Sequence, residues 1–98
     1  MTHVFHLAVR DEWEACVEAD EPYRRSTIGR SLDEEGFIHC SFAAQVEQTA
    51  ATYYAGRDDV LVLTIDTERL DADVRVEGGF PHIYGALPLA AVMDVRPR

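Results

Sequence analysis

The segment at residues 36–41, GFIHCS, constrains the fold of this chain more than any other stretch. It is short and apolar, it begins at a glycine, and a helical pattern rich in alanine follows it over residues 42–54. Because side chains alternate between the two faces of a strand, His39 and Ser41 should share one face while Cys40 points the other way, into the core. The pattern therefore predicts a strand whose end presents a histidine and a serine together, where layered proteins commonly keep polar chemistry.

Length and charge limit the classes of protein to consider. A chain of 98 residues supports one domain, residues 1–98, and its composition of 47% hydrophobic and 28% charged residues is typical of a globular protein. The formal net charge of -9 repels phosphates and anionic lipid, so we expect no extended nucleic-acid partner and no membrane surface. A small domain of this kind could be a monomer or a homodimer.

The basic residues and cysteines exclude further chemistry. All basic residues are arginines, so Schiff-base chemistry, a P-loop lysine and a Ser-Lys dyad are ruled out. Cys16 and Cys40 are too few for a disulfide scaffold and read as buried thiols of a cytosolic protein. The N-terminus lacks the features of a signal peptide and no apolar run reaches the length of a membrane span, so a cytoplasmic location is expected.

Hydrophobic periodicity predicts an α+β fold. The pattern indicates two main helices, at 11–20 and 42–54, with Asp11 and Glu14 as a capping box for the first and Ser41 as a possible N-cap for the second. Ser31 and Gly36 bound a further helical turn within a loop. Besides the strand of residues 36–41, strands are expected at 3–9, 60–65, 74–77, within 80–85 and at 90–95, and the last of these could pair with the first. We therefore expect a small split or strongly bent mixed sheet with its helices on one side.

Two separate strand ends carry the candidate site. His39 and Ser41 share one face of the first, His82 and Tyr84 share one face of the second, and Glu77 lies just before the second pair. Each residue also has an ordinary structural explanation: a helix cap for the serine, hydrogen-bonded histidines, a core tyrosine and an exposed glutamate. We predict that the two strand ends converge on one pocket.

A local basic cluster stands out in so acidic a chain. Arg24, Arg25 and Arg30 lie within seven positions of the loop before the His39 strand. They are either a solvated group paired with nearby carboxylates or a clamp for a phosphate or carboxylate, which suits the planar guanidinium group.

Three kinds of chemistry compete at these residues. A Cys40 nucleophile with His82 as its base is disfavoured, because strand alternation turns the cysteine away. A metal site at His39, His82 and a carboxylate lacks the usual spacing of ligands, and no metal is expected. The third is a pocket in which His39, Ser41 and Tyr84 hydrogen-bond a sugar or nucleotide while Glu77 or His82 acts at the reacting carbon.

The chain resembles a small prokaryotic family called domain of unknown function 952. The resemblance covers nearly the whole length and rests on the early Trp13 helix, the Ser31-Leu32 pair, the GFIHCS segment with the following Gln45-Val46, the strand end at 63–66 and the FPHIYGAL segment at 80–87.

That family has been grouped by fold and motif with the ADP-ribosyltransferase superfamily, whose members bind NAD in the cleft of a split sheet. By this resemblance His39 and Ser41 would hold the adenosine-side ribose, His82 or Tyr84 would stack on nicotinamide, and Glu77 would take the acidic role. The resemblance implies an ADP-ribosyltransferase-like fold, a nucleotide or NAD-like ligand, and transfer or hydrolysis of ADP-ribose.

Two other functions remain open from the sequence. The same pocket, with Arg24, Arg25 and Arg30 beside it, could belong to a non-enzymatic module that binds a small anionic metabolite. The chain could also be an accessory protein without a ligand. Whether the protein is an enzyme is therefore left open, as are its substrate and acceptor.

Overall fold

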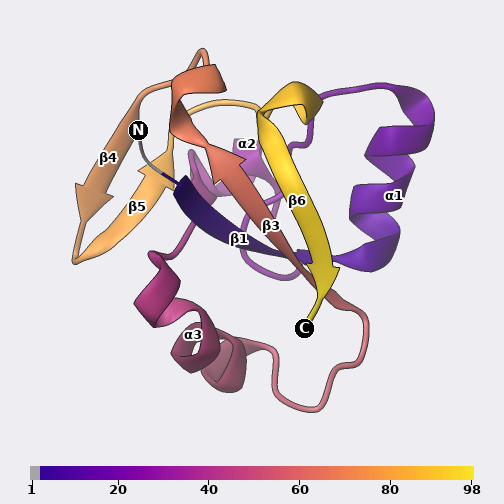
Figure 1. Ribbon diagram of the computed structural model, residues 1–98, viewed down its shortest axis with the longest axis vertical. Coiled ribbons are helices and arrows are strands. Elements are labelled where there is room, and N and C mark those ends of the chain that lie inside the picture. Colours follow the sequence, from indigo (N-terminus) through magenta and orange to yellow (C-terminus); the bar gives the residue numbers. More distant parts are fainter. Residues whose placement is uncertain (1–2) are drawn as a thin grey trace.

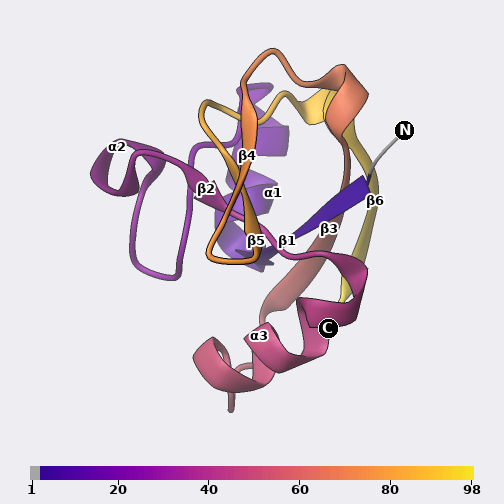
Figure 2. The same cartoon turned by 90° about the vertical axis from the view of Figure 1, so that its left-hand side faces the viewer.

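Six strands form two three-stranded sheets in the computed structural model, which describes residues 3–98 (Figure 1). The first sheet has the order β1-β3-β6, with strands β1 (His3–Val9), β3 (Val60–Asp66) and β6 (Val92–Pro97). The second has the order β2-β5-β4, with strands β2 (Ile38–His39), β5 (Phe80–Ile83) and β4 (Val74–Glu77). All neighbours are antiparallel, and Figure 2 shows the sheets as two separate layers. The α+β class and the split of the strands into two sheets are confirmed, whereas the expectation of a mixed sheet was wrong, because every strand pair is antiparallel.

The two sheets meet at one backbone bridge. The N–H of Phe5 donates to the carbonyl of Ser41 at 2.9 Å, and the N–H of Ser41 donates to the carbonyl of Phe5 at 2.7 Å. Within residues 3–98 no other strand pairing joins β1 to the segment that contains β2. The outer edge of β1 is therefore open beyond Phe5, and side chains must satisfy its backbone there.

The apolar strand β3 is the centre of the first sheet and is covered on both faces. One face packs with Trp13 of α1 (Arg10–Ala19) and with the second sheet. The other face packs through Val60 and Val62 against Ala50 of α3 (Val46–Tyr53). The prediction that the helices lie on one side was wrong, because a strand that is apolar on both faces needs cover on each.

The helix ends show which of the predicted capping boxes form. The short helix α2 (Leu32–Glu35) has the capping box of Ser31 and Glu34, and it ends at Gly36 with φ +88°, as the sequence predicted. The box predicted at Asp11 does not form, because α1 already begins at Arg10, with Val9 in the N-cap position.

The second main helix begins later than expected. A 3₁₀ turn, η1 (Ala43–Gln45), precedes α3, and its N-cap is Phe42 rather than Ser41. The Ser41 backbone forms the bridge to Phe5, and its hydroxyl donates to Thr49 instead of capping the helix. Two further 3₁₀ turns are η2 (Thr67–Arg69) and η3 (Leu89–Ala91).

The last strand does not pair with the first. It pairs with β3, in a register that places Val95 opposite Leu63, and an irregularity follows at Thr64 and Ile65. The free edge of β1 is instead directed toward Ser41. No helix in the part of the chain described is long and apolar enough to cross a membrane.

Candidate functional site

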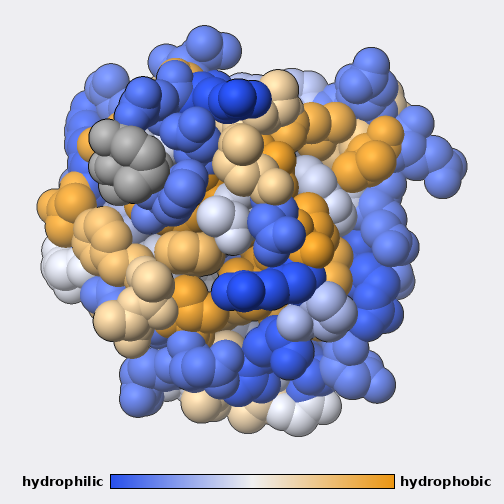
Figure 3. Space-filling model, in the orientation of Figure 1, coloured by the Kyte–Doolittle hydropathy of each residue, from blue (hydrophilic) through white to orange (hydrophobic). Residues whose placement is uncertain are grey.

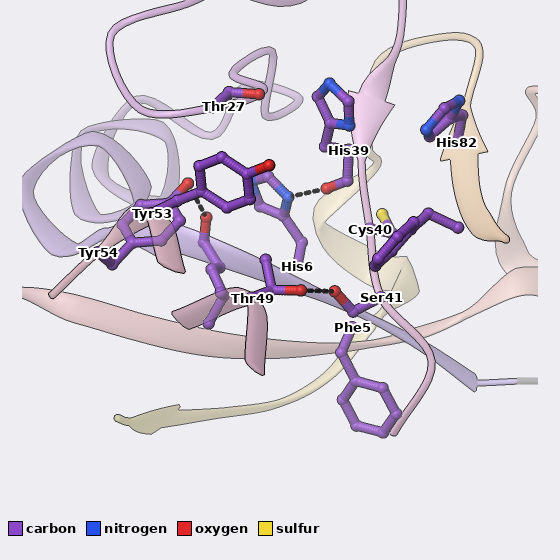
Figure 4. A pocket seen from close by; sticks show the side chains of 12 residues that line it. Phe5, His6, Thr27, His39, Cys40, Ser41, Thr49, Tyr53, Tyr54 and His82 are labelled. Atoms are coloured by element: carbon purple, nitrogen blue, oxygen red, sulfur yellow. Dashed lines mark hydrogen bonds between the residues drawn. The ribbon is translucent and has the colours of Figure 1, made fainter. Parts of the chain in front are cut away.

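A cavity of about 250 Å³ opens at the place where β1 and β2 separate (Figure 4). Strand β1, the segment around β2, strand β5 and helix α3 all contribute to its walls, together with Thr27 from the loop. The residues that line it are Phe5, His6, Leu7, Thr27, His39, Cys40, Ser41, Thr49, Tyr53, Tyr54, Phe80 and His82. The cavity is therefore a direct consequence of the split between the sheets.

The structure brings His39 and His82 together. They are register partners on β2 and β5, and their ring centroids lie 5.0 Å apart. Both line the cavity, and Figure 4 shows their rings at its rim on neighbouring strands. The sequence predicted that the two strand ends converge, and cross-strand pairing is the physical means by which they do so.

Each of these imidazoles is hydrogen-bonded to a carboxylate through one ring nitrogen. Nε2 of His39 lies 2.9 Å from Oε1 of Glu35, and Nδ1 of His82 lies 2.7 Å from Oε1 of Glu77. A carboxylate at one nitrogen fixes the orientation of the ring and leaves the second nitrogen for proton transfer or for a ligand. The arrangement is therefore that of two carboxylate–histidine pairs side by side.

A second hydrogen bond, from Tyr84, holds the Glu77 carboxylate in place. The hydroxyl of Tyr84 donates to the same carboxylate oxygen that His82 contacts, and both contacts hold the pKa of Glu77 below its usual range. The carboxylate in turn raises the pKa of Tyr84. The guanidinium carbon of Arg75 lies 4.5 Å from the centroid of the Tyr84 ring. Glu77 and Tyr84 stand behind His82 and do not line the cavity.

An aromatic ring orients the two histidines. Phe37 stacks on His82 with centroids 4.0 Å apart, and it meets the edge of His39 at 4.7 Å. It also lies 5.3 Å from the ring of Tyr84. The four rings form one cluster, in which Phe37 limits the rotation of both imidazoles.

Side chains from distant segments hold the backbone of His39. The buried Ser26 hydroxyl accepts from the N–H of His39 at 3.1 Å and donates to the carbonyl of Phe37 at 2.7 Å. On the other side, Nδ1 of His6 lies 2.5 Å from the carbonyl oxygen of His39. A strand of two residues has few ladder bonds of its own, so these side chains supply the missing partners.

His6 is neutral and connects the cavity to the core. A carbonyl can only accept, so Nδ1 carries the proton, and Nε2 accepts from the hydroxyl of Tyr23 at 2.9 Å. Burial lowers the pKa of His6 to about 4 and raises the pKa of Tyr23. At neutral pH the pair therefore acts as an uncharged hydrogen-bonded bridge across the split.

Ser41 and Cys40 both line the cavity but differ in their chemical surroundings. The hydroxyl of Ser41 donates to Oγ1 of Thr49 at 3.3 Å, so the serine lies between the bridge and α3. Cys40 belongs to the apolar core cluster, and burial raises the pKa of its thiol. A thiolate nucleophile at this position is therefore disfavoured, in agreement with the alternation argument.

The arginine cluster forms ion pairs, and one of them involves Glu35, the carboxylate that holds His39. Arg24, Arg25 and Arg30 contact Asp33, Glu12 and Glu35 at 2.7, 2.8 and 3.2 Å respectively. None of these three arginines lines the cavity. A role in holding phosphate stays a prediction, and it would require at least one of these pairs to open. Within residues 3–98 no three His, Cys, Asp or Glu side chains are arranged to hold a metal ion.

Sequence reasoning missed several side chains of the site, among them His6, Tyr23, Ser26, Glu35 and Phe37. The alternation of the first strand placed His6 on the same face as Val4 and Ala8, which lie in the core, so its burial could have been found. The contacts of Tyr23 and Ser26 join segments far apart in the chain and leave no local pattern. Glu35 was hidden in the predicted helical turn before Gly36.

The comparisons with known proteins agree with this architecture. Residues 7–95 match the family model described as Protein of unknown function (DUF952). The crystal structure of protein CC0527 from Caulobacter crescentus is similar with a TM-score of 0.83 and 30% identity, over 98% of this chain and 85% of that chain. The solution NMR structure of the same protein gives a TM-score of 0.76 and 30% identity, over 98% and 84%. No curated protein matches this chain. The chain belongs to the DUF952 family.

Proposed function

We propose that this protein binds a nucleotide or NAD-like ligand in the cavity between the two sheets and transfers or hydrolyses ADP-ribose. The observation that carries the proposal is that His39, Ser41 and His82 line one cavity at the split of the sheet. This is the placement expected from the resemblance of the sequence to the ADP-ribosyltransferase superfamily.

The size and lining of the cavity indicate which part of such a ligand enters it. Ligand pockets commonly measure about 300–1,000 Å³, and at about 250 Å³ this cavity suits one ring with its ribose rather than a whole dinucleotide. Tyr53 and Phe80 supply aromatic surface, and no carboxylate or arginine of the described chain lines it. Aromatic side chains of this kind offer a surface on which a ligand ring can stack.

The carboxylate–histidine pairs supply the chemistry in this proposal. When the bond between the nicotinamide nitrogen and the ribose C1′ breaks, an acceptor hydroxyl or water attacks C1′ and must lose a proton. His82, with Nδ1 fixed by Glu77, is placed to take that proton at its other nitrogen. His39, fixed by Glu35, is placed to hydrogen-bond the ligand at the rim.

Isothermal titration with NAD, ADP-ribose and nucleotides at millimolar concentration tests the binding step. We expect binding by the wild type, loss of binding in His39→Ala and His82→Ala while both variants stay folded, and normal binding in His3→Ala, an exposed histidine outside the cavity. Release of nicotinamide from NAD tests the chemistry. Absence of binding to all of these compounds removes the main support for the proposal.

The second candidate is a non-catalytic module for a small anionic metabolite, and one observation argues against catalysis. Glu77 and Tyr84, two of the predicted site residues, lie behind His82 instead of lining the cavity. If a ligand binds but no nicotinamide is released and no ADP-ribose is consumed, this second function is favoured.

A further inference from the structure

Strand β4 is an edge of the second sheet in the chain from residue 3 to residue 98, and it forms a hairpin with β5. Figures 1 and 2 show the β4–β5 hairpin at the side of the molecule away from α1. Val76, in the middle of β4, is 61% exposed, and Phe80 of the same hairpin is also exposed. In Figure 3 hydrophobic surface is visible at the left margin, where this hairpin lies.

The backbone of β4 presents unpaired hydrogen-bonding groups at Val76. Val76 lies opposite Pro81, whose carbonyl accepts from the N–H of Cys40 on the β2 side at 3.0 Å. Opposed residues of an antiparallel pair alternate along the strands. One pair exchanges backbone hydrogen bonds, and in the next pair the N–H and C=O groups point away from the partner strand. The N–H and C=O of Val76 therefore point away from β5, toward the open side of the sheet.

The charges of β4 are complementary to those of a second copy of the same strand. Arg75 and Glu77 flank Val76, and antiparallel pairing centred on Val76 places Arg75 opposite Glu77 of the second copy, twice. Opposite charges directly across an antiparallel pair are stabilising, whereas like charges are destabilising. A register that places Arg75 opposite Arg75 is therefore disfavoured, and the high exposure of Val76 favours the alignment centred on this residue.

We propose that the protein forms a two-fold homodimer in which β4 pairs with β4 of a second copy, centred on Val76. The two second sheets then become one continuous six-stranded sheet, and the exposed valines meet at the two-fold axis. The dimer requires no ligand, so it stands or falls independently of the proposed function.

The dimer would also change the surroundings of the candidate site. Glu77 fixes His82 through Nδ1, and pairing brings the guanidinium group of Arg75 from the second copy next to this carboxylate. The second copy would thus add a positive charge to the one that Arg75 of the same chain already places near the carboxylate–histidine pair. Charged side chains on a short edge strand hinder its pairing with strands of other proteins. The charges of β4 therefore restrict pairing to a strand with the complementary pattern, such as β4 of a second copy.

A cysteine at the two-fold axis tests both the interface and its register. Cα atoms of a hydrogen-bonded antiparallel pair lie about 5.5 Å apart, within the range of about 4.4–6.8 Å that a disulfide spans. In a Cys16→Ser background under mild oxidation, Val76→Cys should form a covalent dimer rapidly. The matched control is Val95→Cys, an exposed valine between Asp94 and Arg96 on the edge strand β6 of the other sheet. Val17→Cys, exposed on α1, measures random collision.

Sedimentation velocity of the wild-type chain over a range of concentrations gives the second readout. We expect a reversible dimer that Val76→Lys converts to monomer, since two ammonium groups would meet at the axis, while Val76→Thr leaves it intact. Circular dichroism verifies that both variants fold. A wild type that stays monomeric at millimolar concentration overturns the proposal. So does faster crosslinking of Val95→Cys than of Val76→Cys, which would place the interface on β6.

Discussion

His6 and His39 are joined across the gap between the two sheets, with Nδ1 of His6 2.5 Å from the carbonyl oxygen of His39. The first lies on β1 and the second on β2, and 33 positions separate them in the sequence. The contact replaces a ladder hydrogen bond that the diverging strands can no longer make. This hydrogen bond therefore keeps β1 and β2 connected beside the cavity, and through it His6 holds the strand that carries His39.

The buried state of His6 makes the stability of the fold depend on pH. Its pKa falls from 6.5 to about 4 on folding because burial disfavours the charged ring. Between these values the unfolded chain binds more protons, so the free energy of unfolding rises with pH from about 4 to 6.5 and then levels off. The full difference is roughly 3 kcal/mol, at about 1.4 kcal/mol for each pKa unit. Urea unfolding at a series of pH values measures this dependence.

Two substitutions separate the charge of His6 from its hydrogen bond. In His6→Asn the amide nitrogen can take the place of Nδ1, so the bond to His39 is kept while the titration disappears. The difference between the wild-type and His6→Asn curves should vary over pH 4–6.5. His6→Leu should be less stable than the wild type at neutral pH, since each buried polar partner left unpaired costs about 1–3 kcal/mol, and the difference should shrink toward pH 4 because this variant has no ring to protonate. Identical pH curves for the wild type and His6→Asn would contradict the assignment.

The hydroxyl of Tyr84 controls the ionisation of Glu77. Its hydrogen bond is the largest cause of the lowered pKa of Glu77, and the hydrogen bond from His82 is the second. Tyr84→Phe removes the hydroxyl but keeps the ring beside Phe37 and Arg75. We expect the Glu77 carboxyl to titrate at higher pH in this variant, as followed by the NMR shift of its side-chain carbon. Glu47, exposed on α3, is the internal reference, and an unchanged Glu77 titration would refute the contact.

Local patterns in the sequence predicted the elements better than their assembly. The strand at Val74–Glu77 and the capping box of Ser31 and Glu34 are confirmed because they depend on neighbours within a few residues. Pairing of β6 with β3 was missed, since strand order depends on which edges remain free after packing. The two carboxylates that hold His39 and His82 also differ in whether a local pattern indicated them. Glu77 was proposed because it precedes the second pair, whereas Glu35 looked like an ordinary residue of a helical turn.

Residue 85 must be glycine because there is no room for a side chain, and not because its backbone conformation excludes other residues. A Cβ atom at this position would lie 2.6 Å from the Cβ of Ala72, which packs against the main core cluster. Gly85→Ala should therefore destabilise the fold by about 1–3 kcal/mol, the usual range for overpacking. Ala72→Gly removes the opposing methyl group, so the double variant should recover part of the loss. Thermal unfolding of the two single variants and the double variant gives the coupling, and purely additive effects would show that this contact is not the cause.

Cys40 should behave as a core residue and not as a nucleophile. Its thiol is buried next to the cavity, and burial raises its pKa well above that of a free cysteine. In a Cys16→Ser background, iodoacetamide at pH 8 should leave the native protein unmodified and alkylate Cys40 rapidly once urea unfolds it. The reason is that alkylation requires the thiolate, which is scarce while the thiol stays buried. Mass spectrometry measures the extent of modification. Rapid alkylation of the folded protein would instead show an activated thiol at the cavity and would restore the cysteine mechanism that strand alternation disfavours.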